Sequence, residues 1–287
     1  MEPGALPVGI HGADMRIAVT GGSGSVGKHV IAKAVAMGHS VRNIDRVQAP
    51  EGSIPAGVEY VNAELSDYQS FHDAIDGFDV LIHLAAIPAP RGYPEHVVHN
   101  NNVTSSYNAL LAAAKVGIKR VVQASSINAI GAVYSRWPTY EFLPVTELHP
   151  TYSEDPYSLS KWICEIQGDA MARRYEDMTI ASLRFHWVVA NLEMAQTHAN
   201  KNSDSNAKQL WAYTLAESAA RACLAILDAP YVGHEAFYIV SPTTVMAEPT
   251  ADLIAQWWPK VPITKPIRGH EGVYDCSKAQ RLLGWTH

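Results

Sequence analysis

Tyr157 and Lys161 stand four residues apart in the segment Tyr157-Ser158-Leu159-Ser160-Lys161. On a helix, that spacing places both side chains on one face, about one turn apart. A phenol with an ordinary pKa of about 10 is a poor base at neutral pH. A neighbouring ammonium favours the phenolate and lowers that pKa. The pair predicts a site where Tyr157 exchanges a proton with a substrate oxygen while hydride moves between the adjacent carbon and a nicotinamide.

Three glycines, Gly21, Gly24 and Gly27, lie between a β-branched run and an amphipathic stretch. Glycines at this spacing allow a tight turn, a close approach of the backbone to a pyrophosphate, and close packing of helix on strand. The helix that follows supplies N–H donors at its N-terminus, beside Ser25 and Val26. The segment predicts a loop that binds the phosphates of a dinucleotide.

An acidic residue, Asp45, ends the second expected strand about 20 residues after the glycines, where a carboxylate binds the adenosine ribose hydroxyls. This carboxylate disfavours a 2′-phosphate and therefore favours NAD. Arg46 follows it and can reach such a phosphate, so NADP stays open. Glu64 and Leu65, after the third expected strand, complete the predicted adenosine end of the site.

Regular alternation of strands and helices must position these residues. Apolar runs predict strands, and helical spacing predicts helices between them. The strands are expected at 16–20, 41–44, 58–61, 79–84, 120–124 and 180–184, and the helices at 26–37, 68–75, 100–116 and 157–175. Strands that are apolar throughout, each followed by a helix, indicate a parallel sheet covered on both faces. The predicted fold class is α/β, a doubly wound Rossmann sheet.

The regularity weakens after Arg184. Residues 191–208 are polar and predict an exposed loop, 215–227 predict a helix, and 236–240 predict a strand. We therefore expect a disordered lead at 1–14, a dinucleotide-binding Rossmann domain at 15–186, and a small C-terminal substrate-binding lobe at 187–287, interleaved with late sheet elements.

Composition excludes several function classes. A net charge of −6 argues against a nucleic-acid or anionic membrane partner. Cys164, Cys223 and Cys276 lie far apart without a CxxC spacing, so we expect neither a metal site nor a disulfide framework. No stretch approaches the ~20 apolar residues of a membrane span, and the N-terminus has no secretory pattern. We expect a cytoplasmic protein with a small-molecule substrate.

Several motifs occur together in a recognisable order: TGGSGSVG from Thr20, HLAA from His83, NVTSSYNALLAA from Asn102, SSINAIG from Ser125, YSLSK from Tyr157 and LRF from Leu183. In this order the chain resembles the extended short-chain dehydrogenase/reductases, the NAD-dependent epimerase/dehydratase family. The resemblance covers nearly the whole chain from Met15. Its motifs are specific for fold and cofactor and poorly specific for substrate.

The resemblance implies roles for individual residues. Ser126 matches the catalytic serine beside Tyr157 and Lys161, and Asn102 matches an asparagine of the active-site hydrogen-bond network. Residues implied to face the cofactor are Leu84, Ala85, Ala86 and Ser125. The family often forms dimers through its two long helices, so a homodimer through 100–116 and 157–175 is expected.

Departures from the family pattern narrow the chemistry. Ile127 and Asn128 stand where nucleotide-sugar 4,6-dehydratases have Asp-Glu, and the segment QLWAYTLAESAA from Gln209 lacks the arginine that grips a sugar-nucleotide diphosphate. The SSINAIG run is closer to a uronate-dehydrogenase-like branch, although Ile127 replaces a polar residue there. The expected substrate contacts are Ser126, Asn128, Trp187 and Trp211, with Tyr134 and Trp137 as further aromatic candidates; His186 is expected at the nicotinamide end.

Three functions remain open from the sequence. The first is an NAD(P)-dependent oxidoreductase that acts on a carbinol or ketone carbon of a small non-nucleotide substrate, with Tyr157 as general acid/base. The second is an epimerase, dehydratase or lyase that uses tightly bound NAD⁺ for transient oxidation. The third is a non-catalytic dinucleotide-binding protein, against which the intact Ser, Tyr and Lys argue.

Overall fold

A seven-stranded sheet with all strands parallel forms the centre of the computed structural model, which describes residues 14–199 and 203–287. Its spatial order is β3-β2-β1-β4-β5-β6-β9. The strands are β1 (Arg16–Thr20), β2 (Ser40–Ile44), β3 (Glu59–Val61), β4 (Val80–His83), β5 (Arg120–Ser126), β6 (Thr179–Phe185) and β9 (Gly233–Ile239). The predicted doubly wound α/β class is confirmed. The predicted lead segment lies outside the described residues, except for Asp14.

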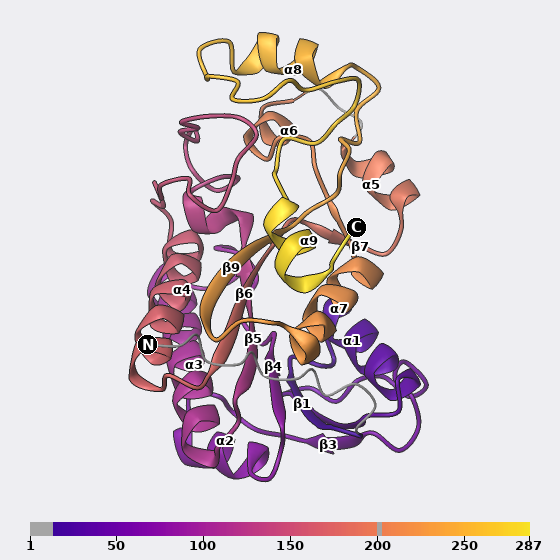
Figure 1. Ribbon diagram of the computed structural model, residues 1–287, viewed down its shortest axis with the longest axis vertical. Coiled ribbons are helices and arrows are strands. Elements are labelled where there is room, and N and C mark those ends of the chain that lie inside the picture. Colours follow the sequence, from indigo (N-terminus) through magenta and orange to yellow (C-terminus); the bar gives the residue numbers. More distant parts are fainter. Residues whose placement is uncertain (1–13, 200–202) are drawn as a thin grey trace, which may run out of the picture.

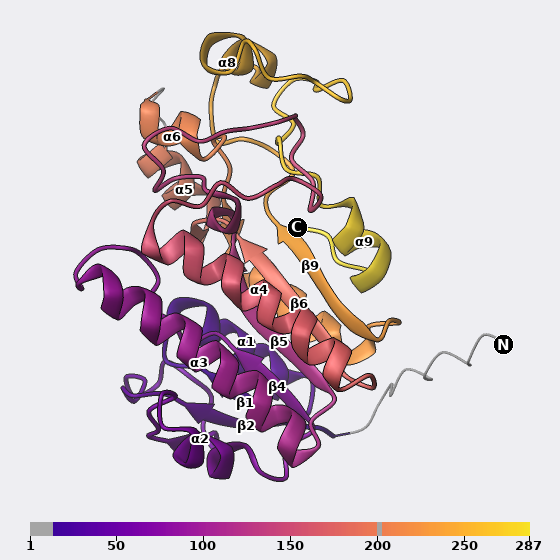
Figure 2. The ribbon, with the colours of Figure 1, turned by 90° about the vertical axis from the view of Figure 1, so that its left-hand side faces the viewer.

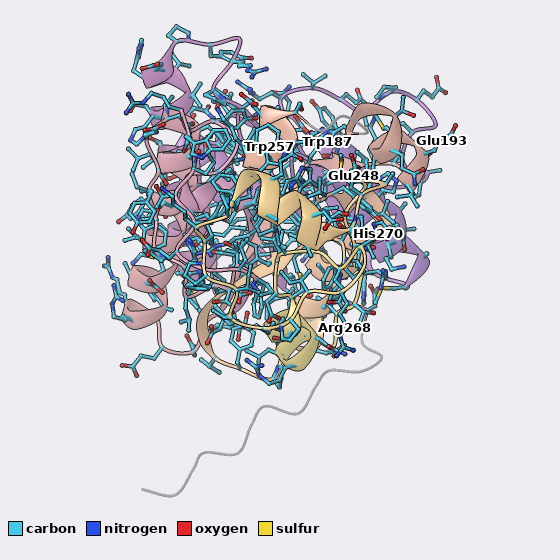
Figure 3. All side chains as sticks on the ribbon, turned by 90° about the horizontal axis from the view of Figure 1, so that it is seen from above. Trp187, Glu193, Glu248, Trp257, Arg268 and His270 are labelled. Carbon is cyan, nitrogen blue, oxygen red and sulfur yellow. The ribbon has the colours of Figure 1, made fainter. Side chains whose placement is uncertain are left out.

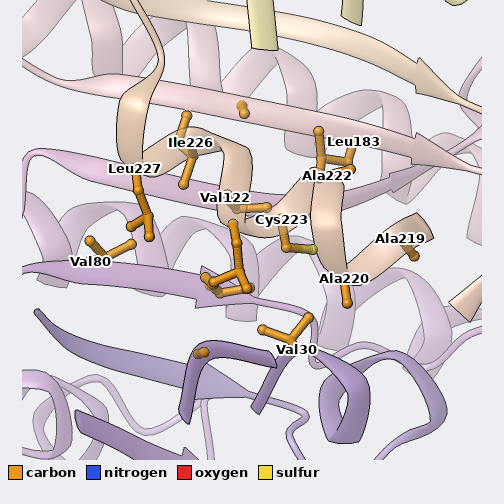
Figure 4. Close-up of a cluster of buried hydrophobic side chains, with 14 of the residues drawn as sticks. Val30, Val80, Val122, Leu183, Ala219, Ala220, Ala222, Cys223, Ile226 and Leu227 are labelled. Atoms are coloured by element: carbon orange, nitrogen blue, oxygen red, sulfur yellow. The ribbon is translucent and has the colours of Figure 1, made fainter. Parts of the chain in front are cut away.

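Helices cover both faces of this sheet (Figures 1 and 2). One face carries α2 (Tyr68–Ile75), α3 (Glu95–Val116) and α4 (Pro156–Arg174), and the other carries α1 (Ser25–Ala36), α7 (Ala216–Leu224) and α9 (Ser277–Leu283). Figure 4 shows the apolar layer between sheet and α7, where Val80, Val122 and Leu183 of the strands meet Ala220 and Cys223 of the helix. Because the helices exclude water from both faces of the sheet, the strands are apolar throughout and do not alternate between apolar and polar residues.

A second hydrophobic core lies beyond the carboxyl ends of the strands. It joins the segment after β5, which begins with the 3₁₀ turn η1 (Ile127–Ile130), to α8 (Thr250–Trp257) and to the loops before α9. A small parallel pair, β7 (Val188–Val189) and β8 (Thr214–Leu215), connects this region to the sheet. Residues 187–287 therefore do not form one separate lobe, because α7, β9, α9 and the 3₁₀ turn η2 (Ala225–Asp228) pack on the sheet. The domain boundary at 186 stays a prediction.

The predicted exposed loop at 191–208 is wrong, because this segment contains α5 (Leu192–Ala199) and α6 (Asp204–Lys208). The polar residues that suggested a loop act at helix starts: the Asn191 side chain accepts from the N–H of Met194, and Ser203 stands at the N-cap of α6. Ala195 and Ala207 are fully buried and fix these short helices to the second core. No helix among the described residues is long and apolar enough to span a membrane.

The sheet order reverses between β1 and β4, since the chain adds strands on one side of β1 up to β3 and then crosses to its other side. At such a switch point the loops after neighbouring strands separate and leave a crevice that binds ligands. His83 ends β4 there, fully buried, with its Nδ1 2.8 Å from Thr20 Oγ1. Burial, with a smaller effect of Lys161, lowers the pKa of His83 to about 3.

This histidine predicts acid sensitivity. Below pH ~6.5 the unfolded chain protonates His83 while the folded chain does not, so the free energy of unfolding falls by up to about 1.4 kcal/mol per pH unit. Between pH 6.5 and 5 we expect a loss of roughly 2 kcal/mol from this residue, which His83→Gln removes. Urea unfolding at both pH values measures it, with the exposed His96→Gln as control. Equal pH dependence of His83→Gln and the wild type would contradict the assignment.

Candidate active site

A cavity of about 980 Å³ opens at the carboxyl ends of β1, β4, β5 and β6. It brings together nearly all residues that sequence reasoning proposed. Those that line it are Gly21, Gly24, Ser25, Val26, Gly27, Asp45, Arg46, Glu64, Leu65, Leu84, Ala85, Ala86, Ser125, Ser126, Asn128, Tyr157, Lys161, His186 and Trp187. Three predicted residues, Asn102, Trp211 and the aromatic candidate Trp137, are not part of the lining, whereas the other aromatic candidate, Tyr134, is. Trp137 stacks on Trp258, with ring centres 5.0 Å apart.

The glycine loop has the geometry of a phosphate-binding turn. Gly21 has a φ of +68°, and a Cβ there would lie 2.8 Å from the amide nitrogen of Ala85. A Cβ at Gly27 would lie 2.3 Å from the carbonyl oxygen of Gly21, so helix α1 approaches the turn only because this residue is glycine. The first turn of α1 contains no acidic residue that would compete for its N–H groups. The loop fits the pyrophosphate of a dinucleotide.

The end of the cavity that contains the glycine loop is also acidic. Asp45 accepts hydrogen bonds from the N–H of Ser23 (3.1 Å) and of Val47 (3.2 Å), which fix its carboxylate beside the loop. Arg46 is engaged with Glu64, with 3.7 Å between Nη1 and Oε2. This end suits ribose hydroxyls, which donate to carboxylates, better than an added phosphate.

Tyr157 and Lys161 reach the cavity from the first turns of α4, and Ser126 reaches it from the end of β5. The helix begins where the Asp155 carboxylate caps the N–H groups of Tyr157 and Ser158, both at 3.0 Å. Lys161 donates to the carbonyl oxygen of Ala124 at 2.7 Å, and its Nζ lies 5.7 Å from the centre of the Tyr157 ring. The cap and the lysine together fix the register between α4 and β5.

Burial raises the pKa of Tyr157, and the hydrogen bond with Ser126 opposes this by stabilising the phenolate. The sequence argument assigned the lowering effect to Lys161. In the structure Ser126 has this effect, because the ammonium of Lys161 is directed to a backbone carbonyl. Burial also lowers the pKa of Lys161. The site therefore holds its proton on Tyr157 at neutral pH until a further positive charge is bound beside the ring.

Asn128 determines which way the Ser126 hydroxyl points. The N–H of Val133 donates to Asn128 Oδ1 at 2.8 Å, and this orients the amide so that Nδ2 donates to Ser126 Oγ at 3.2 Å. The N–H of Asn128 donates to the same oxygen at 3.1 Å. A hydroxyl accepts two hydrogen bonds and donates one. With both acceptor positions used, the Ser126 proton is available only for Tyr157 or for a substrate oxygen.

Behind this serine lies a buried ion pair. Arg184 of β6 donates to both carboxylate oxygens of Glu165 on α4, at 2.9 and 2.8 Å, and both side chains are almost fully buried. Ser125 donates to the same carboxylate at 2.5 Å, and Arg184 also donates to the hydroxyl of Tyr238 at 3.2 Å. The Ser125 side chain borders the cavity, but its hydroxyl is used by Glu165, so it offers the cofactor no hydroxyl donor.

The remaining predicted residues are held by contacts within the fold. Asn102, 2% exposed, bonds both backbone groups of Ile87 and donates to Ser160 Oγ, so it fastens the loop after β4 to α4. Trp211 is fully buried in the second core with a φ of +55°. His186 donates from Nε2 to Gln209 and accepts at Nδ1 from the N–H of Trp187, and burial lowers its pKa to about 4.

Several lining residues were not predicted. Ser205 and Asn206 come from the segment that was expected to be an exposed loop, and Gln209 directly follows that segment. Figure 3 labels Trp187, another residue of the lining, in a view from above. Arg91 and Asn101 come from the loop after β4 and the start of α3. Of these residues, only Arg91 could have been predicted from the sequence, because it is a cation four residues after Ile87 in the loop that follows a cofactor-binding motif.

The description "NAD dependent epimerase/dehydratase family" belongs to the family model that matches residues 17–239. The chain belongs to this family. Because the match covers more than half of the chain and includes both the glycine loop and the Tyr157–Lys161 pair, it confirms the resemblance, the enzyme class and NAD as the family's cofactor.

Individual relatives share part of the sequence or the fold. A putative UDP-glucose 4-epimerase of Methanocaldococcus jannaschii is 36% identical over 154 residues, which are 52% of this chain and 48% of that protein. The chain spans about half the length of the curated relatives that it matches. A short-chain dehydrogenase/reductase superfamily protein from Agrobacterium tumefaciens with bound NAD has a TM-score of 0.70 at 24% identity and covers 94% and 92% of the two chains. A mutated uronate dehydrogenase has a TM-score of 0.63 at 23% identity, covering 93% and 84%.

The role of Asn128 leads to a prediction. In Asn128→Asp, an oxygen replaces Nδ2 and accepts a hydrogen bond from the Ser126 hydroxyl. Ser126 can then no longer donate to the reacting oxygen. We expect kcat of NAD-linked turnover to fall about a hundredfold to a thousandfold, the order of one lost donor at a developing charge. In a Ser126→Ala background the same change should cost much less. Equal losses in both backgrounds would show that Asn128 does not act through Ser126.

Proposed function

We propose that the chain catalyses NAD-dependent hydride transfer at the carbinol or ketone carbon of a small, non-nucleotide substrate. The observation that carries this proposal is the arrangement of one continuous cavity. Its one end has the glycine loop and Asp45, and its other end has Ser126, Tyr157 and Lys161. A dinucleotide held by the first group extends toward the second, where an acid/base and a hydrogen-bond donor converge.

Each residue has a defined task in the oxidation direction. The substrate hydroxyl passes its proton to Tyr157, and Ser126 donates to the same substrate oxygen and holds it in place. Bound NAD⁺ supplies the acceptor for the hydride from the substrate carbon. Because the ammonium of Lys161 is anchored on Ala124, the deprotonated form of Tyr157 that takes up the proton is favoured only once a further positive charge is bound beside the ring.

The residues that line the cavity opposite the sheet favour a substrate that contains no nucleotide. Among the described residues, the side chains that the C-terminal part contributes are Trp187, Val188, Ser205, Asn206 and Gln209, none of which is charged. A diphosphate bound between the two parts of the protein would require cations on this wall. Adding the dinucleotide to a cavity of about 980 Å³ also leaves limited room, since sites for single small ligands range over ~300–1,000 Å³.

The second candidate is an epimerase that oxidises its substrate transiently and keeps NAD bound. The family description and the putative UDP-glucose 4-epimerase among the relatives favour it. An elimination, or an epimerisation at a neighbouring carbon, needs a second acid or base. The described lining near Tyr157 offers none that is free. Both nitrogens of His186 are hydrogen-bonded, and Asp45 and Glu64 lie at the adenosine end.

We also propose a homodimer. The outer surfaces of α3 and α4, which lie side by side in Figure 2, expose Tyr107, Leu159 and Ile166 by 40–44%. Such apolar side chains gathered on two adjacent helices favour a self-complementary interface. A cytoplasmic location stays a prediction, supported by the three free cysteines.

The dimer predicts that Ile166→Glu elutes as a monomer in size-exclusion chromatography while the wild type elutes as a dimer. Met37→Glu, which changes an exposed apolar residue at the end of α1, is the matched control and should remain dimeric. A monomeric wild type, or dimers in both variants, would contradict the interface.

The hydride-transfer proposal predicts that NADH forms when NAD⁺ and a suitable alcohol or hydroxy acid are mixed with the protein, and that Tyr157→Phe reduces kcat at least a hundredfold. Absorbance at the NADH band measures both across a panel of sugar acids, hydroxy ketones and aryl carbinols. Tyr134→Phe, whose hydroxyl is not assigned to proton transfer, is the control. Undiminished turnover in Tyr157→Phe would falsify the mechanism.

A further inference from the structure

Arg91, an exposed arginine without an ion-pair partner among the described residues, stands at the substrate end of the cavity. Arg91 lies in the loop between β4 and α3, and its guanidinium carbon is 6.0 Å from the centre of the Tyr134 ring. Tyr134 in turn meets Tyr157 edge to face, with ring centres 5.7 Å apart. A single aromatic ring therefore separates the guanidinium from the catalytic phenol. Contact with an aromatic face stabilises the cation and limits its motion.

The charges along the cavity are distributed unequally. Within the described lining, the carboxylates are Asp45 and Glu64, both at the adenosine end. The cations are Arg46, Arg91 and Lys161, and two of them already have partners: Glu64 for Arg46 and the carbonyl of Ala124 for Lys161. No carboxylate among the described residues pairs with Arg91. Asp155, behind Tyr157, is outside the lining and caps α4.

We propose that Arg91 binds a carboxylate of the substrate, so that the substrate is a hydroxy acid whose reacting carbon lies at Tyr157 and whose carboxylate lies against the Tyr134 face. This rests on the proposed function and specifies its substrate class. A guanidinium binds a carboxylate through two parallel hydrogen bonds, which no other lining side chain of the substrate end offers. The uncharged groups of Asn101, Ser105 and Asn206 remain for hydroxyls of the same molecule.

The arrangement also gives Arg91 a role in selectivity. The guanidinium of Arg91, which is exposed and lines the cavity, attracts an anionic group, whereas a neutral analogue leaves it in contact with solvent. An acid should therefore bind much more tightly than its methyl ester. A lysine at this position keeps the charge but loses the paired hydrogen bonds, and it should restore only part of the difference.

Binding to the NAD⁺-loaded Tyr157→Phe protein tests this assignment without relying on turnover. Isothermal titration calorimetry compares glucuronate and galacturonate with their methyl esters. We expect the acid to bind about tenfold to a hundredfold more tightly than the ester, in line with one charged, paired interaction. Arg91→Gln should remove this preference, and Arg91→Lys should restore part of it. Arg136→Gln, which removes an exposed cation paired with Glu154, is the matched control and should leave the preference unchanged.

Other outcomes overturn the assignment. Equal binding of acid and ester shows that no carboxylate is recognised. A weaker affinity for NAD⁺ in Arg91→Gln, with the acid preference intact, shows that the guanidinium serves the cofactor's phosphates. Tighter binding of UDP-glucose than of the acids, lost in Arg91→Gln, shows that the anion is a diphosphate. If the acids bind through Arg91 but the wild type forms no NADH from them, the hydride-transfer proposal fails and the anion site stands.

Discussion

The buried contact between Glu165 and Arg184 connects the parts of the protein that must not move relative to one another. It joins α4 to β6, and through Ser125 and Tyr238 it extends to β5 and β9. Removing two charges from water is costly, and breaking such a pair by deleting one partner costs about 3–5 kcal/mol because a bare charge remains. Three N–H groups of Arg184 and the hydroxyl of Ser125 each face an acceptor in this network, so α4 has one favourable position against the sheet. Since α4 carries Tyr157 and Lys161 while β5 carries Ser126, the same contact sets the geometry of the residues proposed to be catalytic.

The side chains at both ends of the cavity are likewise held in place by specific contacts. Close packing at Gly21 and Gly27 brings the first turn of α1 to the sheet edge, and Asp45 is held there by backbone N–H groups. At the opposite end the hydroxyl of Ser126 is oriented by Asn128, which is itself oriented by Val133. A carboxylate at one end and a cation at the other define a direction for a ligand pair: ribose toward Asp45, and the reacting carbon toward Tyr157.

Much of this site follows from local sequence, because its residues lie in regular positions. Apolar runs predicted six of the seven strands close to their true ends, and a separate run predicted β9, though not its place in the sheet. The helix α3 begins at Glu95, five residues earlier than expected, because Val97 and Val98 are the only apolar residues of its first eight positions and do not make a helical period. The glycine loop, Asp45 and the Tyr157–Lys161 pair were predictable because each depends on spacing within one or two elements.

What could not be predicted depends on tertiary contacts. Asn102 and Trp211 are buried for packing, and nothing in their neighbours' types distinguishes that from a ligand contact. Ser205, Asn206 and Gln209 reach the cavity only because α6 is anchored by Ala207 in the second core. Arg91 reaches it because Asn102 fastens the preceding loop to α4. Each of these contacts joins residues that are far apart in the sequence, so local composition does not predict it.

The ratio of NADH formed to substrate consumed tests the central claim most directly. The wild-type protein is mixed with excess NAD⁺ and a hydroxy acid, and both quantities are followed in the same reaction. Net hydride transfer predicts one NADH released into solution for each substrate molecule oxidised. Substrate conversion with no accumulation of free NADH, to an isomer or a dehydrated product, would contradict the account and establish transient oxidation with retained cofactor.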